Sequence, residues 1–66
     1  MPSSVIAAFY YNSGLEALRI VFVSGMVYEY RNVPERIYEK FKRTRSKGSF
    51  LNRHIKGRYD FKKITQ

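Results

Sequence analysis

The 66-residue chain contains no cysteine and no tryptophan, and it has only one histidine, two prolines and five acidic residues. Without cysteine, neither a disulfide nor a thiolate metal site can support so small a domain. No apolar run approaches the roughly 18 residues that a membrane span needs, and residues 1–4 lack the basic stretch that opens a secretory signal peptide. We therefore expect a cytoplasmic protein with no membrane association, held together by apolar packing.

The few titratable residues other than Lys and Arg give little support for catalysis. Glu35 and Glu39 are the only carboxylates close in sequence, and Arg43 follows Glu39 by four residues. This spacing predicts a helical ion pair rather than the pKa-shifted pair that acid–base catalysis needs. His54 falls on an apolar arc and has no second metal ligand nearby, so we expect it in the core. The sequence predicts no enzyme activity, no metal and no cofactor.

Positive charge is the main excess in the composition, and it is concentrated in the second half. Thirteen Lys and Arg against five Asp and Glu give a net charge of +8. The content of hydrophobic residues, 44%, is higher than that of a disordered basic tail. Residues 1–30 hold one basic and two acidic residues, and residues 31–66 hold twelve basic and three acidic residues. A partner that carries negative charge is the first functional expectation.

The first half predicts three antiparallel strands. Apolar or alternating segments cover residues 5–11, 16–23 and 26–30. A break at residues 12–14 and a Ser24-Gly25 turn separate them, because glycine accepts positive φ without steric cost. The gaps are too short for a crossover, so the strands should form a meander.

The second half predicts two helices that cover one face of this sheet. Pro34 suits the first position of the first helix, and Ser46 can cap a second helix that stops near Gly57. Tyr59, Phe61 and Ile64 are interspersed with charged residues, so the chain can end in a short strand or an extended tail. The apolar residues at helical spacing are Ile37, Tyr38 and Phe41 in the first helix and Phe50, Leu51 and Ile55 in the second. The fold class is α+β with the element order βββαα and room for a fourth strand.

An ordered set of motifs resembles the KTSC domain. Residues 25–34 read GMVYEYRNVP, residues 37–38 read IY, and residues 46–55 read SKGSFLNRHI, with Tyr59 downstream and Ser4 and Tyr11-Asn12 upstream. The resemblance covers residues 4–64, which we take as the domain. Asn12 and Thr44 depart from the family pattern, at positions that look structural.

The KTSC resemblance implies a small domain more directly than a function. The family is named for its occurrence at the C-terminus of some lysyl-tRNA synthetases, and it also occurs as a short stand-alone bacterial or phage protein. Attachment to a synthetase suggests RNA binding.

The helical half contains the best candidates for anion binding. Arg36, Lys40 and Arg43 recur at i, i+4 and i+7, opposite the apolar side of the first helix. The segment between the helices concentrates further cations and hydroxyls at a helix N-terminus. Asn52, Arg53 and Lys56 should face away from the apolar side of the second helix. The predicted phosphate-contacting residues are Arg36, Lys40, Arg43, Arg45, Ser46, Lys47, Asn52, Arg53 and Lys56. The alternative is a solvated basic face that only aids solubility.

Two groups of tyrosines are candidates for base stacking. Tyr28 and Tyr30 share one face of a strand, and we expect them in the core under the helices rather than on an open stacking surface. Tyr10 and Tyr11 point to opposite faces of the first strand, and an exposed Tyr10 is the better candidate for stacking.

The resulting hypothesis is a module that binds RNA or single-stranded nucleic acid through phosphate contacts. Six such contacts would make affinity fall on the order of a thousandfold between 50 and 200 mM salt. Two alternatives stay open: an interaction module or phage-encoded inhibitor with an acidic protein partner, and an oligomer that sequesters a nucleotide-like anion. An open sheet edge is also compatible with a homodimer.

Overall fold

A single antiparallel sheet with four strands forms one layer of the protein. The computed structural model describes residues 5–64, so Ser4, where the predicted domain begins, lies outside the described residues, as does the rest of the chain start. The strands are β1 (Ile6–Asn12), β2 (Ala17–Phe22), β3 (Val27–Tyr30) and β4 (Phe61–Ile64). Their order in the sheet is β1-β2-β3-β4, with each neighbouring pair antiparallel. The predicted meander is confirmed, and the C-terminal segment forms the fourth strand for which the sequence left room.

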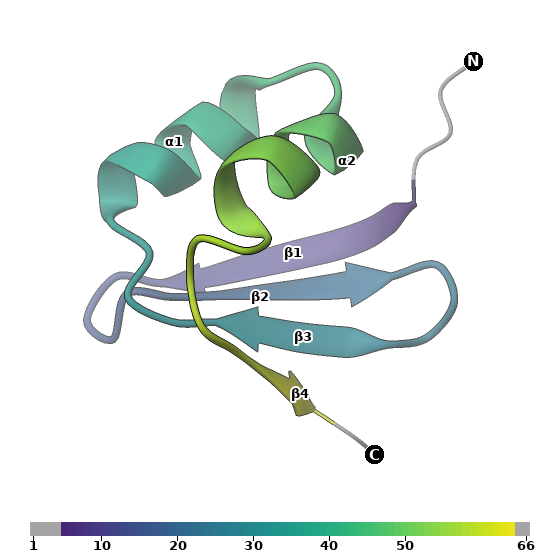
Figure 1. The fold of residues 1–66 in the computed structure, drawn as a ribbon, viewed down its shortest axis with the longest axis horizontal. Helices are drawn as coiled ribbons and strands as arrows, with labels where there is room; N and C mark the ends of the chain where they lie inside the picture. The colour runs from purple at the N-terminus through teal and green to yellow at the C-terminus, as the bar shows by residue number, and fades with distance from the viewer. Residues whose placement is uncertain (1–4, 65–66) are drawn as a thin grey trace.

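The helical layer lies on one face of this sheet (Figure 1). It consists of α1 (Glu35–Arg43), α2 (Lys47–Phe50) and a π-helical turn, η1 (Leu51–Ile55), that continues α2. Pro34 is the N-cap of α1, one residue before the position predicted for it, because its ψ of 152° is extended. A βββαα order followed by β4 therefore describes the fold.

Local polar contacts and one glycine set the two hairpin turns. After β1, the side-chain Oδ1 of Asn12 accepts a hydrogen bond from the backbone N–H of Leu15 at 3.1 Å. Between β2 and β3, Gly25 has a φ of +97°, which favours glycine. Its N–H donates to the carbonyl of Phe22 at 2.9 Å, which closes the turn.

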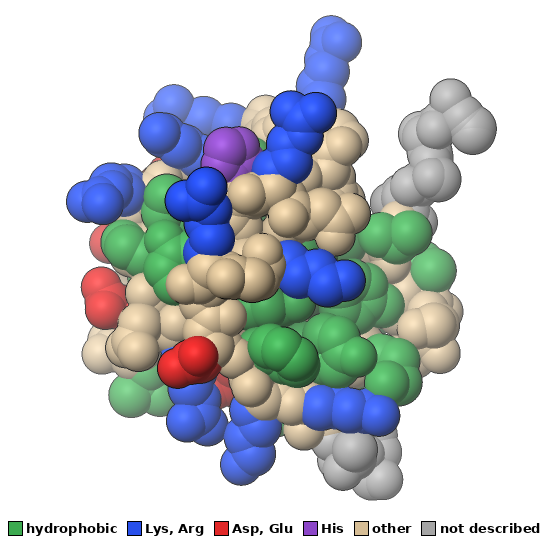
Figure 2. All heavy atoms as spheres, viewed as in Figure 1, with side chains coloured by type: hydrophobic (Ala, Val, Ile, Leu, Met, Phe, Trp, Pro, Cys, Tyr) green, Lys and Arg blue, Asp and Glu red, His purple; other side chains and the backbone are tan. Residues whose placement is uncertain are grey.

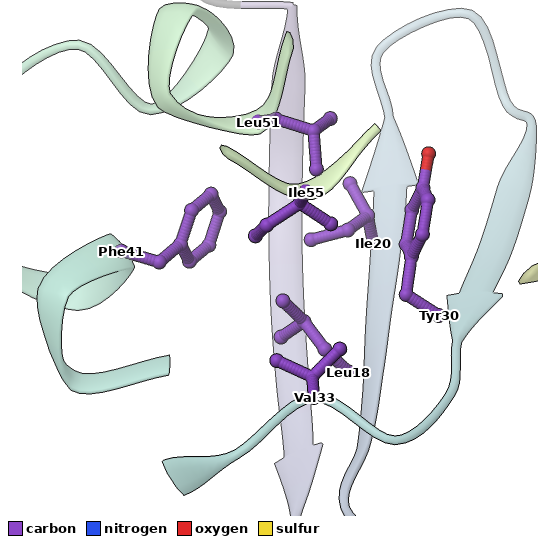
Figure 3. Packing of buried hydrophobic residues seen from close by; sticks show 7 residues of the cluster. All are labelled: Leu18, Ile20, Tyr30, Val33, Phe41, Leu51 and Ile55. Carbon is purple, nitrogen blue, oxygen red and sulfur yellow. The ribbon is translucent and has the colours of Figure 1, made fainter. Parts of the chain in front are cut away.

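The core lies between the sheet and the helices (Figure 3). Leu18, Ile20 and Tyr30 contribute from the strands, and Phe41 and Ile55 reach down from the helical layer. All five are at most 2% exposed. The buried cluster consists of Leu18, Ile20, Tyr30, Val33, Phe41, Leu51 and Ile55. The prediction that Tyr30 is a core residue is confirmed, and Tyr28, on the same face, packs half-buried against this cluster.

The prediction that His54 is a core residue is wrong, because its side chain is exposed. The prediction assumed α-helical spacing, but residues 51–55 form a π turn, in which the N–H of Lys56 donates to the carbonyl of Leu51 at 2.7 Å. Such a turn holds more residues than an α-helical turn, and it carries His54 away from the buried side that Leu51 and Ile55 occupy. The His54 ring instead packs against Phe50, with centroids 4.6 Å apart.

Tyr11 links β1 to the segment that leads into α1. Its hydroxyl donates a hydrogen bond to the carbonyl of Val33 at 2.7 Å, and its ring stacks on Tyr38 with centroids 4.4 Å apart. Burial raises the pKa of the Tyr11 hydroxyl, and the negative charges of Glu16 and Glu35 raise it further. Tyr11 therefore holds its proton more strongly in the folded than in the unfolded chain.

We expect Tyr11→Phe to lower the free energy of unfolding by about 1 kcal/mol at neutral pH, because the Val33 carbonyl loses its donor. The raised pKa also predicts a pH dependence. The stabilisation is complete below the unfolded pKa of about 10 and is lost as pH rises through the higher folded pKa. Urea denaturation at neutral and alkaline pH checks both points. An unchanged midpoint at neutral pH would show that the hydrogen bond contributes nothing.

Candidate nucleic-acid interface

The basic stripe predicted on the first helix lies on the solvent side of α1. Arg36, Lys40 and Arg43 are all exposed, whereas Phe41 is fully buried on the opposite side. The 3.6-residue period of the helix explains both placements. The three cations therefore form a row that is open to a partner.

Neighbouring charges on α1 are arranged differently from the prediction. Glu39 pairs with Lys42 at 3.6 Å, an i,i+3 contact, and not with Arg43 as predicted. The Lys42 ammonium also lies 5.3 Å from the centroid of the Tyr38 ring, so a cation–π contact favours this position of Lys42. Among the described residues Arg43 has no acidic partner, which leaves its guanidinium available.

The segment that joins α1 to α2 provides fewer free groups than predicted. Arg45 and Ser46 are exposed, and Ser46 occupies the N-cap position without making a side-chain cap hydrogen bond. Lys47 is half-buried, and its ammonium donates to the carbonyl of Thr44 at 3.2 Å and lies 5.7 Å from the centroid of the Phe9 ring. Lys47 therefore makes contacts within the domain at the end of α1, unlike the exposed cations of the helical layer, and its predicted phosphate contact stays a prediction.

The predicted polar residues of the second helix are exposed as expected. Asn52, Arg53 and Lys56 all face solvent, and the exposed His54 lies between them in sequence. Figure 2 shows Lys and Arg side chains projecting around the helical layer, with the histidine among them. Neither Arg53 nor Lys56 has an ion pair with the acidic residues of the described chain.

These placements define the helical basic surface, a set of six exposed cations that make no ion pair within residues 5–64. Its members are Arg36, Lys40, Arg43, Arg45, Arg53 and Lys56. Only two salt bridges form among the described residues, and neither involves a member of this set. The surface therefore presents positive charge that the rest of the described chain does not neutralise.

Tyr10 is exposed, as predicted, but it lies on the other side of the sheet. It is 62% exposed, and it pairs across the strands with Arg19, whose guanidinium contacts Glu29 at 2.8 Å. Tyr11, its neighbour, points toward the helices. The sheet therefore separates Tyr10 from the helical basic surface, and the two do not form one site.

A second exposed aromatic group was not identified from the sequence. Phe61, on the edge strand β4, is 54% exposed and lies opposite Tyr30, on the face that carries the helices. The centroid of its ring lies 5.1 Å from that of Tyr28, and the Tyr28 and Phe22 ring centroids are 5.5 Å apart. We call Phe22, Tyr28 and Phe61 the aromatic strip. The apolar residues among residues 59–64 predicted a strand, but they carried no signal that this strand lies beyond the cover of the helices.

The described residues offer little for other kinds of site. Among residues 5–64, no group of three or more His, Asp and Glu side chains is placed to hold a metal ion. Over the same range, no helix has the length and apolar character needed to cross a membrane.

Comparisons with known proteins agree on one family. The KTSC domain model matches residues 2–59. The chain is 40% identical over 62 residues to a lysine–tRNA ligase of Nostoc punctiforme and 34% identical to one of Trichormus variabilis, with 94% of this chain covered in each case. It spans only 11% of the length of either ligase. The crystal structure of a KTSC domain protein from Yersinia pestis is similar with a TM-score of 0.86 at 35% identity, covering 98% of this chain and 94% of that one.

Proposed function

Since this chain belongs to the KTSC domain family, we propose that it is a nucleic-acid-binding module that contacts RNA or single strands through phosphates. The helical basic surface is the observation that carries the proposal. Its six exposed cations have no acidic partner within the described chain. Phosphate contacts from Lys and Arg supply affinity without reading sequence.

The uneven distribution of charge supports a polyanionic partner. Only one of the thirteen Lys and Arg residues lies in the first 30 residues. On the sheet, Arg19 is already paired with Glu29, whereas six exposed cations of the helical layer have no acidic partner within residues 5–64. A polyanion is therefore attracted more strongly to this layer than to the Tyr10 face of the sheet.

The relatives favour RNA among the polyanions. Two of the proteins that match this chain are lysine–tRNA ligases, and the match covers a small part of each ligase. A domain of this kind attached to a tRNA ligase lies near RNA whenever that enzyme works. We carry that environment over to this chain as part of the proposal.

Salt dependence of binding is the direct test. Fluorescence anisotropy should be measured with labelled single-stranded RNA, single-stranded DNA, duplex DNA and tRNA. With six phosphate contacts to a single strand, we expect the affinity to fall a few hundredfold between about 50 and 200 mM salt. No binding to any of the four probes at low salt would overturn the proposal. Binding that does not weaken with salt would also contradict it, because phosphate contacts release counterions.

A further inference from the structure

We propose that the aromatic strip stacks unpaired bases, so that the ligand of this domain is single-stranded rather than duplex nucleic acid. This inference rests on the proposed function and adds a second contact surface to it. Phosphates would be held by cations beside the strip, and bases would lie on the rings of Phe61 and Tyr28.

The rings of the strip form a continuous apolar surface. Phe61 lies 5.1 Å from Tyr28 and 5.5 Å from Tyr30, measured between ring centroids. Tyr28 continues the series to Phe22 at 5.5 Å, with an interplanar angle of 69°. Tyr30 is only 2% exposed and supports Phe61 from the core. The half-buried Phe22 and Tyr28 therefore pack the strip against the buried cluster, and the strip is most open at Phe61.

The helices leave this part of the sheet uncovered. In Figure 1, α1 and α2 lie above β1 and β2, while β4 projects at the opposite edge of the sheet. Figure 2 shows a patch of hydrophobic side chains on this face, outside the helical layer, with Lys and Arg side chains on both sides of it. Phe61 is 54% exposed and its ring continues to those of Tyr28 and Phe22, and contiguous apolar patches of this kind mark contact surfaces more than single exposed residues do.

The surface beside Phe61 is hollowed. Gly57, Arg58, Tyr59, Asp60 and Phe61 line an open hollow of ≈ 390 Å³. Gly57 makes the turn with a φ of +86°, which brings the chain from η1 back to the sheet edge. A base lying on Phe61 would have room to extend one edge into this hollow.

Charge decides which occupant the strip suits. Lys63 lies opposite Tyr28 in the strand register, on the same face as the rings, and Arg58 lines the hollow. Both side chains are exposed, and neither makes a salt bridge within the described residues. Aromatic rings between unpaired cations match a strand that alternates bases with phosphates. To fit the same surface, a helix or strand of a protein partner would need acidic side chains on both sides of its apolar residues.

An abasic oligonucleotide separates stacking from phosphate contacts. It carries the same phosphates as a normal single-stranded DNA of equal length but no bases. We expect the wild-type protein to bind the normal strand roughly 5- to 150-fold more tightly than the abasic strand, the range that stacking contributes per base. Equal affinity for the two strands would overturn the strip proposal while leaving the phosphate proposal intact. Failure to bind either strand would instead overturn the proposed function.

Phe61→Ala tests the position of the stacking surface. The variant should lose most of the preference for the normal strand and keep the affinity for the abasic strand and the salt slope. Leu15→Ala is the matched control, because Leu15 is 70% exposed in the β1–β2 turn, away from the strip. If Tyr10→Ala removes the preference and Phe61→Ala does not, stacking occurs on the other face of the sheet, and the proposal is wrong.

A single-tryptophan variant keeps the test decisive if Phe61→Ala weakens β4. The chain has no tryptophan, so Phe61→Trp introduces one fluorophore at the centre of the proposed contact, with a larger ring for stacking. Its fluorescence should be quenched by the normal strand and unchanged by the abasic strand. Quenching by neither strand, under conditions where anisotropy shows that both bind, would rule out stacking at Phe61.

Discussion

Replacing Phe41 with alanine is expected to remove a large part of the free energy of unfolding of the domain. The side chain is fully buried between the sheet and the helices, with its ring 5.0 Å from Phe9 of β1 and 6.1 Å from Phe50 of α2. Truncating a buried phenylalanine costs about 3–5 kcal/mol. A chain of this length has a total unfolding free energy of roughly 3–10 kcal/mol, and no disulfide adds to it. A single substitution can therefore remove most of the stability.

Far-UV circular dichroism during a thermal melt checks this expectation. Each kcal/mol shifts the Tm of so small a domain by roughly 4–8 °C, so the Phe41→Ala melt should begin far below that of the wild type. Val23→Ala is the control, since Val23 is 67% exposed and its loss should change stability by less than about 0.5 kcal/mol. A Phe41→Ala melt within a few degrees of the wild type would show that the core described above does not hold the fold.

Phe41 and the core residues around it could be predicted from the sequence, because their apolar side chains recur at clear strand or helix spacings. Leu18 and Ile20 alternate along a strand, and Ile37, Tyr38 and Phe41 recur at helical spacing. Each pattern places its apolar side toward a common core, and the observed burial agrees. Pro34 and Gly25 marked the ends of elements to within a residue.

His54 shows where periodicity fails as a guide. Nothing in residues 46–55 distinguishes an α-helical turn from a π turn, and the difference moves a side chain from the core to the surface. The prediction that Glu39 pairs with Arg43 was wrong for a related reason. Lys42 and Arg43 both lie within reach of Glu39 along the helix, and the ring of Tyr38 favours Lys42. A sequence gives spacing but not such competition between partners.

In the candidate site too, features that follow from helical spacing could be predicted, whereas features that depend on tertiary contacts could not. The solvent side of α1 follows from helical geometry alone, so the exposure of Arg36, Lys40 and Arg43 was predictable. Lys47 was counted among the phosphate-contacting residues, yet contacts with Thr44 and Phe9 hold it. The exposure of Phe61 depends on how far the helices extend over the sheet, which no local pattern records.

Neutralising the row on α1 should weaken nucleic-acid binding more than any other surface change of equal charge. In the triple variant Arg36→Gln, Lys40→Gln and Arg43→Gln, glutamine preserves helix propensity and leaves the buried side of α1 intact. Three lost phosphate contacts should lower the affinity for a single strand on the order of a hundredfold near 0.1 M salt and reduce the salt slope by about 2. Anisotropy titrations at several salt concentrations measure both quantities.

A second triple variant with the same net charge distinguishes binding at the helical basic surface from attraction by the net charge of the whole protein. Arg19, Arg31 and Lys62 are exposed cations outside α1, α2 and η1, and their replacement by glutamine also lowers the net charge of +8 by three. If the helical basic surface binds the phosphates, this control should retain most of the affinity, because none of its three side chains belongs to that surface. Equal losses in the two variants would mean that net charge alone drives binding, and the assignment to α1 would then be wrong.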